Sequence, residues 1–554
     1  MILRYTFSEY ALWILTLVVL AVTVAYPIAM LFYSSIVEDH TITFAAFQRM
    51  IKDPFLPKVT LNTLQLAVVV TFLSIAIGVP LAWLVVRTDL PAKNLIKVLA
   101  TLPFIFPPYL LAMGWISLAD PSIGIINRVY RILGGHGFIV NIYSFWGLVT
   151  VMASRFYVYV FLTTASALEQ MDPSLEEAAR MCGAPLSRVA REITIPLITP
   201  SIVAGALLAF VATVSNFGIP ALIGLPAHYA VLTTVIYSDI NMYDLEGAAA
   251  YSMLLLAISL PLLVVERFIA RGRRYTTVTG RATRPTLMKL GSSRYPILAL
   301  VIAFLMPATL FPLSTLVMMA FLKECYLNPF VISNYSFKNL YDVLFVNPDT
   351  QTAIQDSLIL ATSSATAIAM FGALVAYIVL RTRMAGRTLI NVLASAPFAL
   401  PGSVLALAMI FAFIKTPLFN TLALVFVAYF SRYLSYGVRT CVGSLLQIDP
   451  TLEEAARTSG APWIRTFSDI VIPLIKAGIV SSWILVFMPT LSELTVSVIL
   501  APPTRPTIGK AVYNLMESGQ FGWAYALGFL VLLVVIAGQI AINIVSRRLG
   551  VKTV

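Results

Sequence analysis

Charged residues are scarce in this sequence. Only 11% of the 554 residues are Asp, Glu, Lys or Arg, whereas soluble domains carry roughly 25%. Hydrophobic residues make up 59%, and the mean hydropathy is +0.89. This balance excludes an ordinary water-soluble domain and is typical of a protein embedded in lipid.

Cysteine and histidine are rare as well. The three cysteines lie far apart, so the sequence has no disulfide framework and no metal-binding spacing. The three histidines fall singly in predicted outer loops, and we expect no metal site. These six residues are Cys182, Cys325, Cys441, His40, His136 and His228.

The sequence also lacks the motifs of an enzyme. No G-x-x-x-x-G-K-[ST] phosphate loop is present, because Gly509-Lys510 has no glycine five residues before Gly509. The apolar runs contain no histidine pair, nucleophile elbow or carboxylate cluster. We therefore expect no catalysis and no bound cofactor in this chain.

Long apolar runs are what the sequence does have. A helix needs about 20 apolar residues to cross the bilayer core, and such runs recur about twelve times without the strict alternation of a β-barrel. The expected fold is all-α and polytopic. The runs lie near 10–34, 62–86, 97–118, 144–168, 197–222, 249–270, 295–320, 357–380, 390–414, 421–443, 477–500 and 523–547.

The net charge of +12 is distributed as a topology signal. Residues 271–294 carry seven Arg or Lys and no acid, whereas 222–247 carry three acids and no Lys or Arg. Because excess Lys and Arg mark the cytoplasmic side, we expect both termini and the basic linker 271–294 to be cytoplasmic. The first apolar run is too long for a signal-peptide core, which predicts an uncleaved first span.

A 27-residue segment occurs twice, at 172–198 and 449–475, with seventeen identical positions at an offset of 277. Upstream, Arg87-Thr88 and Arg381-Thr382 match at an offset of 294, so the first half carries 17 extra residues between the two matches. Each half then holds six spans in the same orientation, related by a pseudo-twofold axis along the membrane normal. The predicted halves are 1–270, with core 60–270, and 295–554, with core 355–547.

Each repeated loop reads as a helical hairpin on the cytoplasmic side. Asp172 suits the N-cap, Pro173 the first helical position and Gly183 the C-terminal turn. Glu176 and Arg180 have the i, i+4 spacing of a surface ion pair. The second copy repeats these features, with Asp449, Pro450 and Gly460 in the corresponding places.

Small apolar residues form one stripe on the first helix of each loop: Leu175, Ala178, Ala179 and Cys182, with Leu452, Ala455 and Ala456 in the second copy. A stripe rich in alanine lets another surface approach closely. Glu177 and Glu454 beside it offer a carboxylate to a basic partner. The loop therefore fits a groove of another protein, and the alternative is that it packs on its own membrane domain.

Polar residues inside the spans are candidates for a central pathway, because burying them in hydrocarbon is costly. Ser215 and Asn216 correspond to Ser492 and Glu493 at the offset of 277, and Arg155 corresponds to Arg432. The alternative is that these groups bond the helices to one another.

The loops resemble the signature of the permease subunits of bacterial type I ABC importers. That signature is Glu-Ala-Ala, three residues, Gly, nine residues, then Ile-x-Leu-Pro. The sequence matches it at Glu177-Ala178-Ala179 with Gly183, and at Glu454-Ala455-Ala456 with Gly460; in both copies Ile replaces Leu before the proline.

The resemblance covers roughly 60–270 and 355–547. It implies a bacterial inner-membrane permease whose loops are coupling helices. Two copies of a cytoplasmic ATPase would dock there and bind Mg-ATP, and an extracytoplasmic binding protein would deliver the cargo. No nucleic acid is implied.

The fused two-half chain looks most like the ferric iron importers, on residues 214–224 (VSNFGIPALIG) and 491–497 (LSELTVS). Related permeases carry phosphonates, sugar phosphates, thiamine or polyamines, and these cargoes stay open. A secondary transporter driven by an ion gradient is the rival class, but it gives no reason for the duplicated loop.

Overall fold

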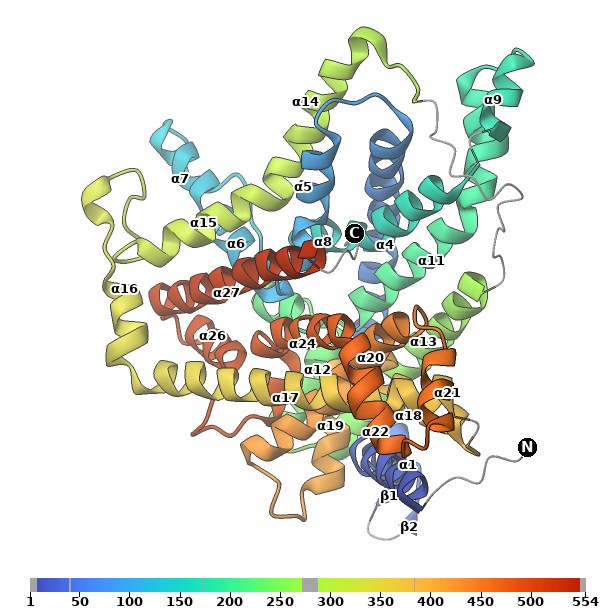
Figure 1. The fold of residues 1–554 in the computed structure, drawn as a ribbon. Helices are drawn as coiled ribbons and strands as arrows, with labels where there is room; N and C mark the ends of the chain where they lie inside the picture. The colour runs from blue at the N-terminus through green and yellow to red at the C-terminus, as the bar shows by residue number, and fades with distance from the viewer. Residues whose placement is uncertain (1–6, 39–40, 173, 272–286, 383, 549–554) are drawn as a thin grey trace.

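The computed structural model describes residues 7–38, 41–172, 174–271, 287–382 and 384–548. These residues are mostly helical, and the sheet among them is a single antiparallel pair, β1 (Val37–Glu38) and β2 (Thr41–Ile42) (Figure 1). The all-α prediction is confirmed. Most of the basic linker, 272–286, lies outside the described residues.

The helices of the first half are α1 (Phe7–Leu20), α2 (Tyr26–Ile36), α3 (Ala45–Lys52), α4 (Leu56–Arg87), α5 (Lys93–Ile105), α6 (Pro108–Ala119), α7 (Ile125–Ile132), α8 (Phe145–Gln170), α9 (Ser174–Met181), α10 (Leu186–Val189), α11 (Ile195–Val214), α12 (Leu232–Asn241) and α13 (Leu245–Arg271). Those of the second half are α14 (Arg294–Leu305), α15 (Phe311–Phe321), α16 (Lys338–Tyr341), α17 (Pro348–Arg381), α18 (Arg387–Ser395), α19 (Gly402–Phe413), α20 (Leu422–Leu445), α21 (Thr451–Thr458), α22 (Trp463–Thr466), α23 (Ile472–Leu474), α24 (Lys476–Leu491), α25 (Thr495–Leu500), α26 (Ile508–Glu517) and α27 (Phe521–Arg548).

Most of the twelve predicted spans correspond to long apolar helices. In the described part of the chain, eight helices are long and apolar enough to cross a membrane, or up to eleven if each bent pair is one span, against the expected twelve. The remaining predicted span, 421–443, is a helix, α20, but it is not among them. α20 is long enough to cross a membrane, but Arg432 and Arg439 lower its apolar character.

Two of the bent pairs turn at corresponding prolines. α5 and α6 meet at 103° before Pro107, and α18 and α19 meet at 117° before Pro401. A proline disfavours the helical conformation of the residue before it, and Phe106 and Leu400 are accordingly extended, with ψ of 147° and 132°. The breaks therefore follow directly from the duplicated sequence.

The two halves do not form separate cores. The first span of the chain, α1 and α2 joined by the π-helical η1 (Ala21–Ala25), packs on α18, α19 and α20 of the second half. In the same way α14 and α15, joined by η5 (Met306–Leu310), pack on α5 and α6 of the first half. Figure 1 shows α1 in blue beside the orange α18 and α22. Each half thus completes the other.

The 17 extra residues of the first half reach the second half. They include α7, whose Arg128 donates hydrogen bonds to the carbonyl oxygens of Cys325 and Leu327 in the loop after α15. Arg128 is buried there. The insertion therefore connects the two halves directly.

Two corresponding glycines lie at close helix crossings. A Cβ on Gly78 of α4 would lie 2.9 Å from the carbonyl oxygen of Tyr157 in α8. A Cβ on Gly372 of α17 would lie 2.9 Å from the carbonyl carbon of Gly437 in α20. Small residues at such crossings let helix backbones approach closely in membranes.

We predict that Gly372→Ala destabilises the protein by about 1–3 kcal/mol, because the added methyl group meets backbone rather than a flexible side chain. Gly443→Ala is the matched control, since Gly443 lies in α20 with no atom near its Cβ position. The measurement is thermal unfolding of the purified chain in detergent. Equal midpoints for the two variants would contradict the crossing.

Candidate functional site

Each repeated loop begins with a helix, and the predicted aspartate bonds the backbone of its first residue. The helices α9 and α21 begin at Ser174 and Thr451, one residue later than the sequence predicted. The Asp172 carboxylate accepts a hydrogen bond from the backbone N–H of Ser174 at 2.9 Å, and Asp449 accepts one from Thr451 at 3.0 Å. These bonds lower the pKa of both carboxyl groups below the usual value. Pro173 lies outside the described residues.

Each helix ends at the predicted glycine. Gly183 and Gly460 have φ of +83° and +86°, in the left-handed region that favours glycine. The next amide then turns back: Ala184 N–H donates to the Ala179 carbonyl at 3.1 Å, and Ala461 to Ala456 at 3.0 Å. These bonds close the helix end in the manner of a glycine C-cap.

A buried arginine holds the first loop to the membrane domain. Arg87, the last residue of α4, donates to the carbonyl oxygen of Met171 at 3.3 Å, and its Nε lies 3.5 Å from a carboxylate oxygen of Glu176. The other oxygen of Glu176 accepts a 2.6 Å hydrogen bond from Thr194.

The predicted pairing of Glu176 with Arg180 is therefore wrong. Among the described residues, the partner of Glu176 is Arg87 of another helix. The physical reason is burial: Arg87 is 4% exposed and needs a counter-charge, whereas Arg180 is exposed and solvated by water.

The second loop is held in the same way. Arg381, the last residue of α17, donates to the carbonyl oxygens of Leu445 at 3.1 Å and Ile448 at 2.6 Å. Its Nε lies 3.0 Å from a carboxylate oxygen of Glu453. The sequence indicated Arg87 and Arg381 as a repeated pair but did not predict this role; their recurrence together with the repeated Glu-Glu pair was the clue to it.

The opposite face of each loop helix is turned away from the chain. Leu175 and Leu452 are each 49% exposed, and Ala178 and Ala455 are exposed beside them. Figure 1 shows α9 and α21 on the same side of the molecule, where α9 projects outward. The small apolar stripe is therefore accessible on both loops.

The second loop is held by additional aromatic contacts. Trp463 stacks on Phe467 with ring centroids 5.5 Å apart, and both rings contact Tyr377 edge-on. Arg457 of α21 donates to the Tyr377 hydroxyl at 3.2 Å. The first half has Trp83, Leu186 and Ala190 at the corresponding positions. The two loops therefore differ in how firmly they are attached.

We predict that Arg381→Ala speeds hydrogen exchange of the backbone amides of 449–461 roughly tenfold or more, since it removes one partner of a buried ion pair and two carbonyl contacts. Arg465→Ala is the control, because Arg465 forms only an exposed pair with Asp469. Exchange measured by mass spectrometry and unchanged in Arg381→Ala would contradict the anchoring role.

Four of the six candidate pathway residues lie at two helix breaks, whereas Arg155 and Arg432 lie within α8 and α20. α11 ends before Ser215 and Asn216, and a π-helical turn follows at η3 (Pro220–Gly224). α24 ends before Ser492 and Glu493, and α25 follows. The breaks meet: a Cβ on Gly218 would lie 3.0 Å from the Leu494 side chain.

The polar groups at these breaks are occupied by nearby backbone. Asn216 Oδ1 accepts from the N–H of Ile219 at 3.0 Å, and Ser492 Oγ donates to the Met488 carbonyl at 3.1 Å. Glu493 is 6% exposed and accepts from the N–H of Val496 at 3.2 Å. These residues cap the broken helices.

The two corresponding arginines have different partners. Arg155 donates to the carbonyl oxygens of Pro103 and Phe106, at the bend between α5 and α6. Arg432 instead places its Nε 3.5 Å from Glu493. Within the described residues, no three His, Cys, Asp or Glu side chains gather as a metal site.

Comparison with known proteins gives full-length relatives. The ferric transport system permease protein FbpB of Actinobacillus pleuropneumoniae is 24% identical over 525 residues, 93% of this chain and 75% of that protein. The Fe(3+)-transport system permease protein FbpB 2 of Haemophilus influenzae is 24% identical, over 95% of this chain and 96% of that protein.

Shorter relatives match one half. The molybdenum transport system permease protein ModB of Escherichia coli is 30% identical over 218 residues, 38% of this chain and 92% of that protein. One chain in a crystal structure of a bacterial alginate ABC transporter, in complex with a pentasaccharide-bound periplasmic protein, superposes with a TM-score of 0.40 at 18% identity, over 48% of this chain and 94% of that chain.

The family model described as the binding-protein-dependent transport system inner membrane component matches residues 74–275 and again 351–551. Together the two matches cover well over half of the sequence. The chain therefore belongs to this family of transport-system membrane components, and it carries the family's domain twice in one polypeptide.

Proposed function

We propose that the chain is the translocation pathway of an ATP-driven importer and that one copy of a cytoplasmic ATPase docks on each of α9 and α21. The observation that carries the proposal is the two-faced loop helix. Glu176 and Glu453 tie one face to the membrane domain, and the opposite face exposes the Leu and Ala stripe. Because the helix is attached to the spans on one face and open on the other, a movement of the docked ATPase is transmitted to the spans.

Residues Glu177, Ala178, Ala179 and Gly183, with Glu454, Ala455, Ala456 and Gly460, form the proposed docking surface. Glu454 is exposed beside its stripe, so its carboxylate is available to a basic group of the ATPase. We propose that both termini and the linker 271–294 lie on this cytoplasmic side, which the distribution of Lys and Arg supports. Mg-ATP would bind to the ATPase subunits.

The proposed cargo is ferric iron, delivered by an extracytoplasmic binding protein. The relatives that match nearly the whole chain are named for ferric transport, which supports this choice. Ferric iron prefers several hard oxygen ligands, whereas the helix breaks offer one carboxylate that is already paired with Arg432. We infer that the binding protein selects the ion and that the pathway passes it without a dedicated site.

We predict that replacing both Glu177 and Glu454 by alanine abolishes most transport while the chain stays in the membrane, because the docking carboxylates are lost. The matched control is Glu192→Ala with Asp469→Ala, two corresponding exposed acids of the same loops that form ion pairs with the exposed Arg188 and Arg465. Uptake and membrane content are measured together. Normal uptake in the Glu177 and Glu454 double variant would refute the docking surface.

We predict that deleting the chain removes ATP-dependent uptake of radiolabelled ferric iron at low external iron. The control is the same strain with the chain restored. If iron uptake is unchanged, the cargo is wrong and the importer assignment stands, with an anion as the next cargo to test. If uptake follows an ion gradient and not ATP, the importer class itself is wrong.

A further inference from the structure

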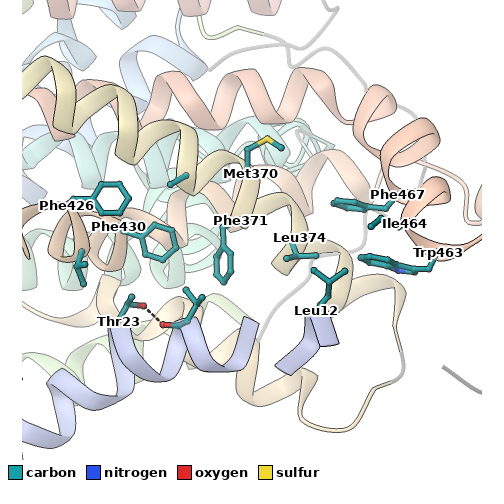
Figure 2. Close-up of a pocket in the computed structure, with 13 residues that line it drawn as sticks. Leu12, Thr23, Met370, Phe371, Leu374, Phe426, Phe430, Trp463, Ile464 and Phe467 are labelled. Atoms are coloured by element: carbon teal, nitrogen blue, oxygen red, sulfur yellow. Dashed lines mark hydrogen bonds between the residues drawn. The ribbon is translucent and has the colours of Figure 1, made fainter. Parts of the chain in front are cut away.

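A cavity of about 620 Å³ lies between the first span of the chain and the second half. α1 and η1 supply one wall, with Leu12, Val19 and Thr23, and α17 and α20 supply the other, with Phe371 and Phe430 among its residues. Figure 2 shows the side chains in a row, from Phe426 and Phe430 at one end to Trp463 and Phe467 at the other. The volume lies within the range of ligand-binding pockets, roughly 300–1,000 Å³.

This cavity has the form of a groove, and its walls are apolar throughout. Thr23 has the one side-chain hydroxyl among the lining residues, and that hydroxyl donates to the Val19 carbonyl of its own helix at 2.7 Å. The indole N–H is the other polar group, on Trp463. A polar occupant would lose its hydrogen bonds to water without replacement, so the groove selects a hydrocarbon.

The groove is elongated and opens sideways. Leu12 to Thr23 spans about 16 Å at 1.5 Å per helical residue, and Met370 and Ile464 at its rim are 52% and 56% exposed. Ala367 and Leu374 precede Arg381, the end of α17, by about 20 and 10 Å. With the basic end of α17 at the cytoplasm, the groove faces the inner leaflet of the bilayer.

The corresponding place in the first half contains packed side chains. There α14 packs directly on the neighbouring spans, with Val301 and Leu305 buried and the Phe304 ring 6.0 Å from Tyr157.

We propose that the groove holds one acyl chain of an inner-leaflet phospholipid. The occupant must be apolar, elongated and present beside the membrane spans, and an acyl chain is the molecule of the bilayer that meets all three conditions. Its headgroup-proximal segment lies against Trp463 and Phe467, and its methyl end points toward Phe426 and Phe430 at the other end of the groove (Figure 2). The rings of Trp463 and Phe467 also contact Tyr377, whose hydroxyl accepts a hydrogen bond from Arg457 of α21.

The bound chain therefore touches the aromatic contacts that hold the second loop. An influence of lipid on ATPase coupling through this loop rests on the proposed function; the binding of the chain does not. The test below measures binding alone, so its failure leaves the proposed function unaffected.

The experiment reads the fluorescence of Trp463. The full-length chain is reconstituted into vesicles of phosphatidylethanolamine and phosphatidylglycerol with brominated or ordinary acyl chains. The contribution of Trp463 to the fluorescence is the difference in emission between the wild type and Trp463→Phe. Because Trp463 is only 6% exposed, a bromine atom contacts the indole only through the groove, and we expect Trp463 to lose most of its emission.

Filling the groove must protect Trp463. Ala367→Phe should restore its emission in brominated vesicles and Ala367→Leu should restore part of it, whereas Ile359→Phe, an added ring on the exposed side of the same helix, should not. Quenching that is absent in the wild type, or equal in Ala367→Phe and Ile359→Phe, would overturn the proposal. Thermal unfolding of each variant verifies that it is folded.

Discussion

Backbone polar groups have no water to bond inside a bilayer, so every break or end of a span must find a partner for its carbonyl groups. In this protein, buried or half-buried arginines supply several of those partners. Arg87 and Arg381 bond the carbonyls at the C-terminal ends of α8 and α20, and Arg155 bonds those at the bend after α5. The loops and the bent spans both depend on these contacts.

The same arginines explain the paired glutamates of each loop. A guanidinium held at a span end requires a counter-charge, and the first glutamate of each pair, Glu176 or Glu453, supplies it. The neighbouring positions 177 and 454 lie beside the small apolar stripe, where the proposed partner binds. One short helix thereby serves two purposes, one for each face.

Duplication has not made the halves equivalent. The second loop has an aromatic set around Tyr377 and Trp463 that the first loop lacks, and the groove beside α1 ends on it. At the helix breaks, Arg432 pairs with Glu493, whereas Asn216 stands at the corresponding position and Arg155 bonds carbonyl groups instead. The hydrogen bonds that Arg128 donates to the second half likewise come from the insertion in the first half. A fused chain can change each copy separately, because the two are no longer encoded by one sequence.

The sequence by itself determined the class of protein, the helical spans and the repeated loops. Those features depend on local properties: apolar run length, proline, N-caps and the glycines that end α9 and α21. Tertiary structure decided which charge meets which, because the partner of Glu176 lies 89 positions away at Arg87 rather than one turn away at Arg180. It also decided that the first span of each half packs on the other. Those outcomes depend on burial and on neighbours distant in the chain, which local pattern does not specify.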